Sequence, residues 1–251
     1  MRRYPAGTLS SSFSFGPGPL SSAIKALIGA NVVLFLLATF SRSLVDQLGL
    51  SPYLFLTDLR LWQPATYMFL HAGVFHILFN MLALWMFGTE LERIWGTRGF
   101  LKFYFVTGIG AGVLTVLFSL LPFDFARSVY GATVIGASGS IYGLLLAYAL
   151  YFPDRPILMY FVFPIPAKYF VMILGAITFY SSLGATGGVA NATHLGGLLV
   201  AYLYLKGFVG GRIGLFSELK YRYLKWKINR VRKKFDVYSG GRANDWDRRV
   251  H

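Results

Sequence analysis

The distribution of apolar residues along the chain predicts a bundle of membrane-spanning helices. A helix needs about 20 mostly apolar residues to cross a bilayer. Six runs approach that length, separated by polar, glycine-rich or proline-rich connections: about 23–40, 73–88, 99–121, 136–152, 165–183 and 190–205. No soluble stretch between them is long enough to form a hydrophobic core of its own. The pattern therefore predicts an all-α polytopic membrane protein, a six-transmembrane-helix bundle.

The segment 41–72 between the first two spans has a different pattern. Charged residues are scattered there among large apolar side chains, and Pro52 and Pro64 interrupt it. Such a segment is too polar to span and too apolar for a free loop. We expect an interfacial loop of short helices, with Trp62 and Tyr67 at the level of the lipid headgroups.

The two ends of the chain lie outside the predicted bundle of residues 22–206. Residues 1–21 are rich in Ser, Gly and Pro and predict a disordered leader. Residues 207–251 form a basic tail, part of which repeats apolar residues at 3-4-3-4 spacing: Tyr221, Leu224, Ile228, Val231 and Phe235. This spacing predicts an amphipathic helix on the anionic cytoplasmic leaflet, or a solvated topology anchor, rather than a nucleic-acid-binding segment.

Composition and charge agree with this picture and give the bundle an orientation. The chain is 55% hydrophobic and 14% charged, and its net charge is +14. Thirteen of its 24 Lys and Arg residues lie in 206–251. With six spans, 21 of the 24 fall on the side that holds both termini and three on the other. The positive-inside rule then places both termini in the cytoplasm of a multi-pass protein of the cell membrane.

The chain contains no cysteine. Disulfides, thiolate catalysis and cysteine-ligated zinc are therefore excluded. We expect neither a metal site nor a cofactor.

Candidate chemistry begins at the glycine-rich stretch Gly136–Gly143, which opens the fourth span. Ser138 lies there between glycines, which let a substrate backbone approach closely. The stretch is not a G-x-S-x-G nucleophile elbow, because Ser140 replaces the second glycine and no strand precedes it. Taken alone, Ser138 is more typical of a serine that packs or bonds to a helix carbonyl.

Histidines inside a bilayer are costly and therefore indicate function. His76 lies on the second span with Asn80 one helical turn later, and His194 lies near the start of the sixth. The predicted topology brings these residues and Ser138 to one depth, below the external surface. A nucleophile, a base and a pair of hydrogen-bond donors are the parts of an acyl-transfer site. Individually, the His76–Asn80 pair also fits interhelical bonding, and His194 fits a proton relay.

Small residues predict that the fourth and sixth spans pack closely. Gly139 and Gly143 form a small-x-x-x-small face on one, and Gly197 and Ala201 form such a face on the other. Contact between these faces would bring Ser138 and His194 within hydrogen-bond reach. Tyr142, one turn after Ser138, would then stack on the imidazole.

With these motifs in place, the chain resembles the rhomboid family of intramembrane serine proteases over about residues 20–206. Three separated motifs carry the resemblance: His76-x-x-x-Asn80, Gly136-x-Ser138-Gly139 with Tyr142, and His194 followed by Gly196-Gly197. The run Glu92–Gly96 resembles the family's E-x-x-x-G.

The resemblance implies a role for each of these positions. Ser138 would be the nucleophile and His194 the general base of a dyad. The oxyanion hole would be formed by the Ser138 amide with His76 and Asn80. Three further residues would support the site: Tyr142, Gly136 and Gly139. The implied substrates are single-pass transmembrane proteins, cleaved within or near the outer end of their span.

One departure and two alternatives accompany this interpretation. The family often has Trp-Arg where this chain has Trp62-Gln63, which leaves open how the interfacial segment is tethered; Arg60 is one substitute. A proton-coupled transporter would use His71, His76 and His194 as a proton path. A non-catalytic membrane chaperone or adaptor would bind client helices without cleaving them.

Overall fold

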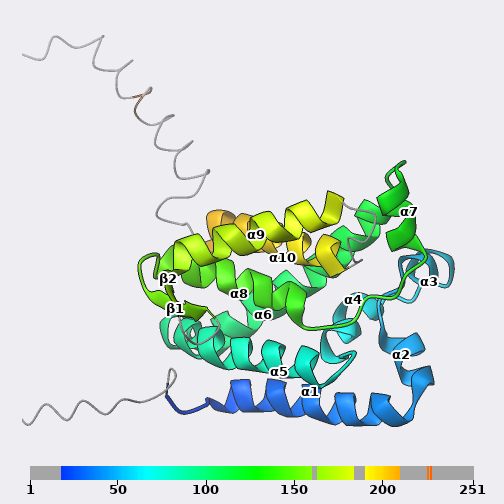
Figure 1. Ribbon diagram of the computed structural model, residues 1–251, viewed down its shortest axis with the longest axis horizontal. Helices are drawn as coiled ribbons and strands as arrows, with labels where there is room; N and C mark the ends of the chain where they lie inside the picture. Colours follow the sequence, from blue (N-terminus) through cyan, green and yellow to red (C-terminus); the bar gives the residue numbers. More distant parts are fainter. Residues whose placement is uncertain (1–17, 160–162, 184–189, 210–224, 226, 228–251) are drawn as a thin grey trace, which may run out of the picture. The chain divides into compact units, whose positions relative to one another are not determined.

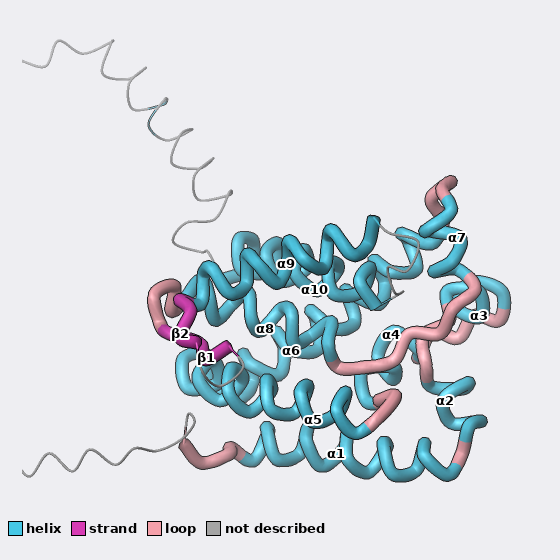
Figure 2. Tube along the Cα trace, in the orientation of Figure 1, coloured by secondary structure: helices cyan, strands magenta, loops and turns pink. Residues whose placement is uncertain are grey.

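A computed structural model of the chain describes residues 18–159, 163–183, 190–209, 225 and 227 (Figures 1 and 2). The chain divides into two units, Met1–Tyr204 and Leu205–His251. Helices dominate the described part of the first unit; in the second, a short π-helical segment η3 covers Leu205–Val209. The expected leader up to residue 17 and nearly all of the basic tail lie outside the described residues, so those expectations stay predictions.

A helix covers most of each predicted apolar stretch. These longer helices are α1 (Ser22–Phe40), α5 (Val74–Ala83), α6 (Thr89–Ser119), α8 (Ser138–Tyr151), α9 (Ala167–Leu183) and α10 (Ala190–Tyr204). Within the described residues, two helical stretches are long and apolar enough to cross a membrane, Ser22–Phe40 and the continuous Val74–Ser119, whereas α8 is apolar but shorter. The described part of the chain is thus mostly helical, as predicted.

The stretch from α5 to α6 contains a chain reversal at Gly96. A π-helical turn, η2 (Leu84–Gly88), joins the two helices, and Gly96 has φ 70° and ψ 164°, outside the helical range. A positive φ of this kind favours glycine. A Cβ on Gly88 would lie 3.3 Å from the Phe100 ring, so the chain after the break packs back on the chain before it. The buried Glu92 carboxylate accepts hydrogen bonds from Thr97 and Ser21 beside this reversal.

Shorter elements connect these helices, and some differ from expectation. They are α2 (Arg42–Leu48), α3 (Pro52–Thr57), α4 (Gln63–Thr66), the 3₁₀ turn η1 (Tyr67–Phe69), α7 (Asp124–Tyr130), β1 (Pro156–Met159) and β2 (Phe163–Pro166). Helix α7 occupies part of a predicted loop. Strands β1 and β2 form an antiparallel hairpin, and α9 begins at Ala167 instead of the predicted Ile165. The reason is that Pro164 and Pro166 disfavour helical backbone before them.

Segment 41–72 forms short helices, as the pattern predicts, whereas its position at the membrane interface stays a prediction. Trp62 is half exposed, whereas Tyr67 is fully buried. Its hydroxyl donates a hydrogen bond to the Gly108 carbonyl of α6 at 2.8 Å. Tyr67 thus anchors the segment to the helical core, and its depth relative to the lipid headgroups stays a prediction.

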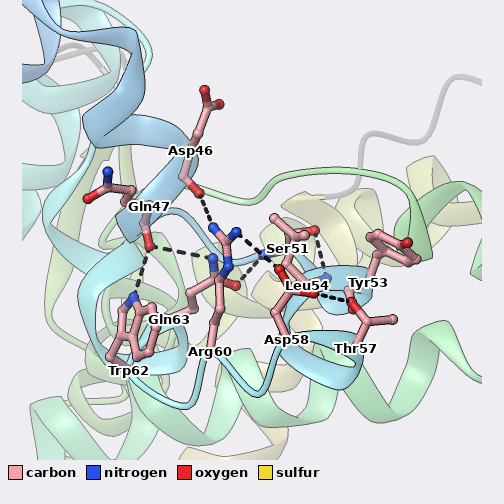
Figure 3. Close-up of polar contacts among 10 residues, drawn as sticks. All are labelled: Asp46, Gln47, Ser51, Tyr53, Leu54, Thr57, Asp58, Arg60, Trp62 and Gln63. Carbon is pink, nitrogen blue, oxygen red and sulfur yellow. Dashed lines mark hydrogen bonds and ion pairs between the residues drawn. The ribbon is translucent and has the colours of Figure 1, made fainter.

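Side chains of residues 60–66 cap the C-terminal end of α2 (Figure 3). The last carbonyls of a helix lack intrahelical partners. Here the Gln47 carbonyl accepts hydrogen bonds from Trp62 Nε1 at 2.9 Å and from Gln63 Nε2 at 3.5 Å. Arg60 bonds to the neighbouring Asp46 carbonyl, and Thr66 bonds to that of Leu48. These donors therefore tether residues 60–66 to the end of α2, within segment 41–72.

Gln63 also connects this cap to the next turn of chain. It is fully buried, and its Oε1 accepts a hydrogen bond from the Ser51 amide at 3.1 Å. The adjacent Leu50 exchanges backbone hydrogen bonds of 2.9 and 2.8 Å with Val134. Gly136 donates its amide to the Tyr67 carbonyl at 2.9 Å. The interfacial segment thus holds the extended chain that leads into Ser138 at two points.

The small-residue faces place α8 against α10 at one glycine pair. A Cβ on Gly197 would lie 2.1 Å from the Gly139 carbonyl oxygen, so the two backbones touch. Gly143 does not share this contact, because a Cβ there would meet Thr107 of α6. The predicted contact between the fourth and sixth spans is confirmed for Gly139 and Gly197, whereas the atoms nearest to a Cβ on Gly143 belong to α6.

Substitution of Gly197 by alanine tests this backbone contact. We expect Gly197→Ala to destabilise the protein by about 1–3 kcal/mol or more, as overpacking does. Gly29 of α1 is the matched control, because a Cβ there meets nothing within 4 Å, and Gly29→Ala should be neutral or stabilising by about 0.5–1 kcal/mol. Thermal unfolding in detergent measures both; equal midpoints for the two variants would contradict the contact.

Removal of the Gln63 amide tests the tether. Gln63→Met keeps the length of the side chain but leaves the buried Ser51 amide without its partner, which should cost about 1–3 kcal/mol of stability. Gln47→Met is the control, because the exposed Gln47 amide bonds to the Ser43 hydroxyl one turn earlier on the same helix. A Gln63→Met variant that unfolds at the same temperature as Gln47→Met would show that the amide does not tether the segment.

Candidate active site

Ser138 and His194 form a hydrogen-bonded pair between two helices. Ser138 is the first residue of α8, and His194 lies in the second turn of α10. Their Oγ and Nε2 atoms are 2.8 Å apart. Both side chains are partly exposed. When Nε2 carries no proton, the hydroxyl donates to it, which is the geometry for proton transfer from a serine nucleophile to a base.

The His194 ring is oriented by stacking on Tyr142. The two rings are nearly parallel, with an interplanar angle of 7° and centroids 4.2 Å apart. The other ring nitrogen, Nδ1, is buried and has no hydrogen-bond partner among the described residues. No Asp or Glu occurs in the sequence of α5, α8 or α10. The arrangement is therefore a pair without the carboxylate that a triad has at Nδ1. A stacked aromatic ring contacts the face of the imidazole instead.

The His76 ring points its Nε2 atom toward the approach to Ser138. The Ala72 amide donates a hydrogen bond to His76 Nδ1 at 3.3 Å. A neutral imidazole with an accepting Nδ1 carries its proton on Nε2. His76 is therefore set up as a hydrogen-bond donor at Nε2.

Gly136 leaves open the space between His76 and Ser138. Its φ of +128° is in the region that favours glycine. A Cβ at this position would lie 2.8 Å from His76 Nε2 and 3.6 Å from Ser138 Oγ. Any larger residue would therefore fill the space that lies between the proposed donor and the hydroxyl.

The start of α8 offers further donors at the same place. The first helical hydrogen bond there runs from the Ile141 amide to the Ala137 carbonyl. The amides of the first residues of a helix, including that of Ser138, precede the intrahelical bonds and carry partial positive charge. Negative charge that develops beside Ser138 Oγ would therefore meet the Ser138 amide and His76 Nε2.

The structure places the remaining predicted residues less directly. Asn80 is buried on α5, and its Nδ2 donates to the His76 carbonyl at 2.8 Å, so one of its amide hydrogens is used within the helix. His71 is buried with its ring edge-on to His76, centroids 4.9 Å apart. Gly139 lies at the α8–α10 contact described above. The structure thus brings together Ser138, His194, Tyr142, Gly136 and His76.

One residue near the site was not predicted from the sequence. Thr178 of α9 has its Oγ1 atom 3.0 Å from the Tyr142 hydroxyl. The available signal was a polar residue in an apolar span, but threonines there usually bond to their own helix.

Comparison with known proteins places the chain in a family. A family model described as the Rhomboid domain matches residues 58–210. The chain is 36% identical over 138 residues to "Rhomboid protein 1, mitochondrial" of Saccharomyces cerevisiae, covering 54% of this chain and 38% of that protein. It is 32% identical over 160 residues to "Rhomboid protease GluP" of Bacillus subtilis, covering 61% and 26%.

In a third relative, the alignment covers a larger share of the relative's own length than in the first two. It is "Rhomboid protease GlpG" of Yersinia pestis, 28% identical over 186 residues, or 74% of this chain and 61% of that protein. The chain thus spans about a quarter to three fifths of the length of these relatives. The domain match covers more than half of the chain, and the mostly helical fold agrees with it. The chain belongs to the rhomboid family.

Proposed function

We propose that this protein is an intramembrane serine endopeptidase that cleaves transmembrane proteins within or near the outer end of their span. The observation that carries the proposal is the 2.8 Å contact between Ser138 Oγ and His194 Nε2. Membership of the rhomboid family and the relatives that are named proteases add support.

The mechanism follows from the positions of these atoms. Ser138 Oγ attacks the substrate carbonyl carbon while His194 Nε2 takes the hydroxyl proton. The carbonyl oxygen becomes an oxyanion in the space beside Gly136, where the Ser138 amide and His76 Nε2 donate hydrogen bonds; the second amide hydrogen of Asn80 is the proposed third donor. Such donors are each worth about 10²–10³ in rate.

Collapse of this intermediate completes acylation. His194 returns the proton to the nitrogen of the leaving amine, and the C–N bond breaks. A water molecule then attacks the Ser138 ester with His194 again as base, which releases the acid and restores the hydroxyl. The site therefore needs water, and the partial exposure of both side chains is consistent with access to it.

We also propose that six helices cross the membrane, with both termini in the cytoplasm. The crossing helices would be α1, α5 with η2, α6, α8, α9 and α10. Helices α2, α3, α4 and α7 lie toward one end of this bundle and the β1–β2 hairpin toward the other (Figure 1). The bias of Lys and Arg assigns the hairpin end to the cytoplasm, which puts Ser138 near the external face.

Cleavage of a single-pass model substrate by the purified protein tests the proposed activity. Ser138→Ala and His194→Ala should each lower cleavage by about 10³-fold or more, as loss of a nucleophile or base does. Ser128→Ala is the control, because its exposed hydroxyl bonds within α7. Mass spectrometry of the fragments locates the cut. Undiminished cleavage by Ser138→Ala would refute the mechanism, and binding of substrate without cleavage by the wild type would indicate an adaptor.

Single cysteines test the proposed topology, because the natural chain has none to interfere. Ser128 in α7 and Asp154 between α8 and β1 are both exposed. We expect a membrane-impermeant maleimide to label Ser128→Cys in intact cells, and Asp154→Cys only after permeabilisation. Labelling of both positions in intact cells, or the reverse pattern, would contradict the orientation.

A further inference from the structure

We propose that Thr178 of α9 is a positioning residue for His194 and that it acts through Tyr142. The inference rests on the proposed Ser138–His194 dyad and extends it to a helix that contributes no catalytic residue. In this proposal, α9 helps to orient the His194 ring.

The hydrogen bonds of Thr178 fix which group donates. Thr178 Oγ1 gives its single proton to the Leu174 carbonyl, one turn earlier on α9, at 2.8 Å. The same oxygen lies 3.0 Å from the Tyr142 hydroxyl. Because the threonine proton is already used, Tyr142 must be the donor and Thr178 the acceptor. The Tyr142 hydroxyl is thus directed toward α9 by a group that is itself held in place.

This contact fixes the Tyr142 ring at its second end. The ring begins on α8, one turn after Ser138, and its hydroxyl ends on α9. Rotation about its side-chain bonds would break the hydrogen bond to Thr178. A ring anchored at both ends presents one face in a defined plane, and that face lies against His194 at 4.2 Å.

His194 needs this support because its own contacts do not fix it. Its Nε2 bonds to Ser138, while its buried Nδ1 has no hydrogen-bond partner in the described parts of the chain. In a catalytic triad a carboxylate on Nδ1 holds the ring in place. The chain Thr178–Tyr142–His194 supplies the orientation by stacking instead. It leaves the Nδ1 proton without a counter-ion.

Burial distinguishes Thr178 from its exposed neighbours on α9. Thr178 is 4% exposed, whereas the neighbouring Ile177 is 58% and Tyr180 is 78% exposed. Thr178 therefore lies on the face of α9 that is packed against the bundle. A shift of α9 away from α8 would break the hydrogen bond to Tyr142. The position of α9 therefore affects the orientation of the His194 ring.

Four variants test the proposal, with the rate of Ser138 modification by a fluorophosphonate as the readout. Thr178→Val keeps the shape but loses the acceptor, and Tyr142→Phe loses the donor but keeps the stacked ring. Each should slow labelling about fivefold, the worth of one net hydrogen bond, and the double variant should be no slower than either. Thr178→Ser restores the hydroxyl and should label at the wild-type rate.

The control is Ser182→Ala, one turn further along α9. Its hydroxyl is also buried but bonds to the Phe179 carbonyl of its own helix. If Thr178→Val acted only by destabilising the protein, a Ser182→Ala variant with an equal fall in unfolding midpoint would slow labelling by the same factor. A wild-type labelling rate in Thr178→Val, with His194→Ala unreactive, would overturn the positioning role and leave the proposed function intact.

A readout independent of reactivity separates the two claims. The chain has four histidines, so the ¹⁵N signals of the His194 ring can be assigned from the His194→Ala variant. We expect Thr178→Val and Tyr142→Phe to shift them, and Thr178→Ser and Ser182→Ala to leave them in place. Unshifted signals in Thr178→Val would overturn the positioning role, whatever the reactivity of the wild type. A wild type that fails to react with the probe would instead refute the proposed function.

Discussion

The close approach of α8 and α10 at Gly139 and Gly197 is the constraint on which the site depends. A Cβ on Gly197 would lie 2.1 Å from the Gly139 carbonyl oxygen, so no other residue fits without moving a helix. Ser138 precedes this contact by one residue and His194 by three. Their 2.8 Å hydrogen bond is thus a consequence of backbone packing. In a bilayer such packing has to supply the association that the hydrophobic effect supplies in water.

A second set of interactions fixes the approach to Ser138. The extended chain before α8 is bonded to segment 41–72 at Leu50 and at Tyr67, and within that segment the Gln63 side chain holds Ser51 and the end of α2 together. The result is an open space at Gly136 between His76 and Ser138. The proposed donors, nucleophile and base therefore come from elements that are each anchored separately, as a preorganised site requires.

Much of the site could be predicted because its chemistry is unusual for a membrane. Histidines in apolar helices are costly and therefore indicate function, glycines beside Ser138 drew attention to it, and small residues at four-residue spacing indicated the helix contact. Other features carried no such signal. The sequence does not indicate that the Tyr67 hydroxyl bonds to the distant Gly108 carbonyl. The β1–β2 hairpin has the composition of a span. Gln63 and Thr178 act through partners distant in sequence, which periodicity does not reveal.

Peptide mapping of the purified protein after reaction with a fluorophosphonate tests the central claim most directly. A serine hydroxyl reacts with such a probe only when a neighbouring base activates it. The account predicts one modified site, on Ser138, whose labelling is lost in His194→Ala while the variant keeps its unfolding midpoint. Absence of modification at Ser138 in the folded wild type, or labelling that is unaffected by His194→Ala, would contradict it.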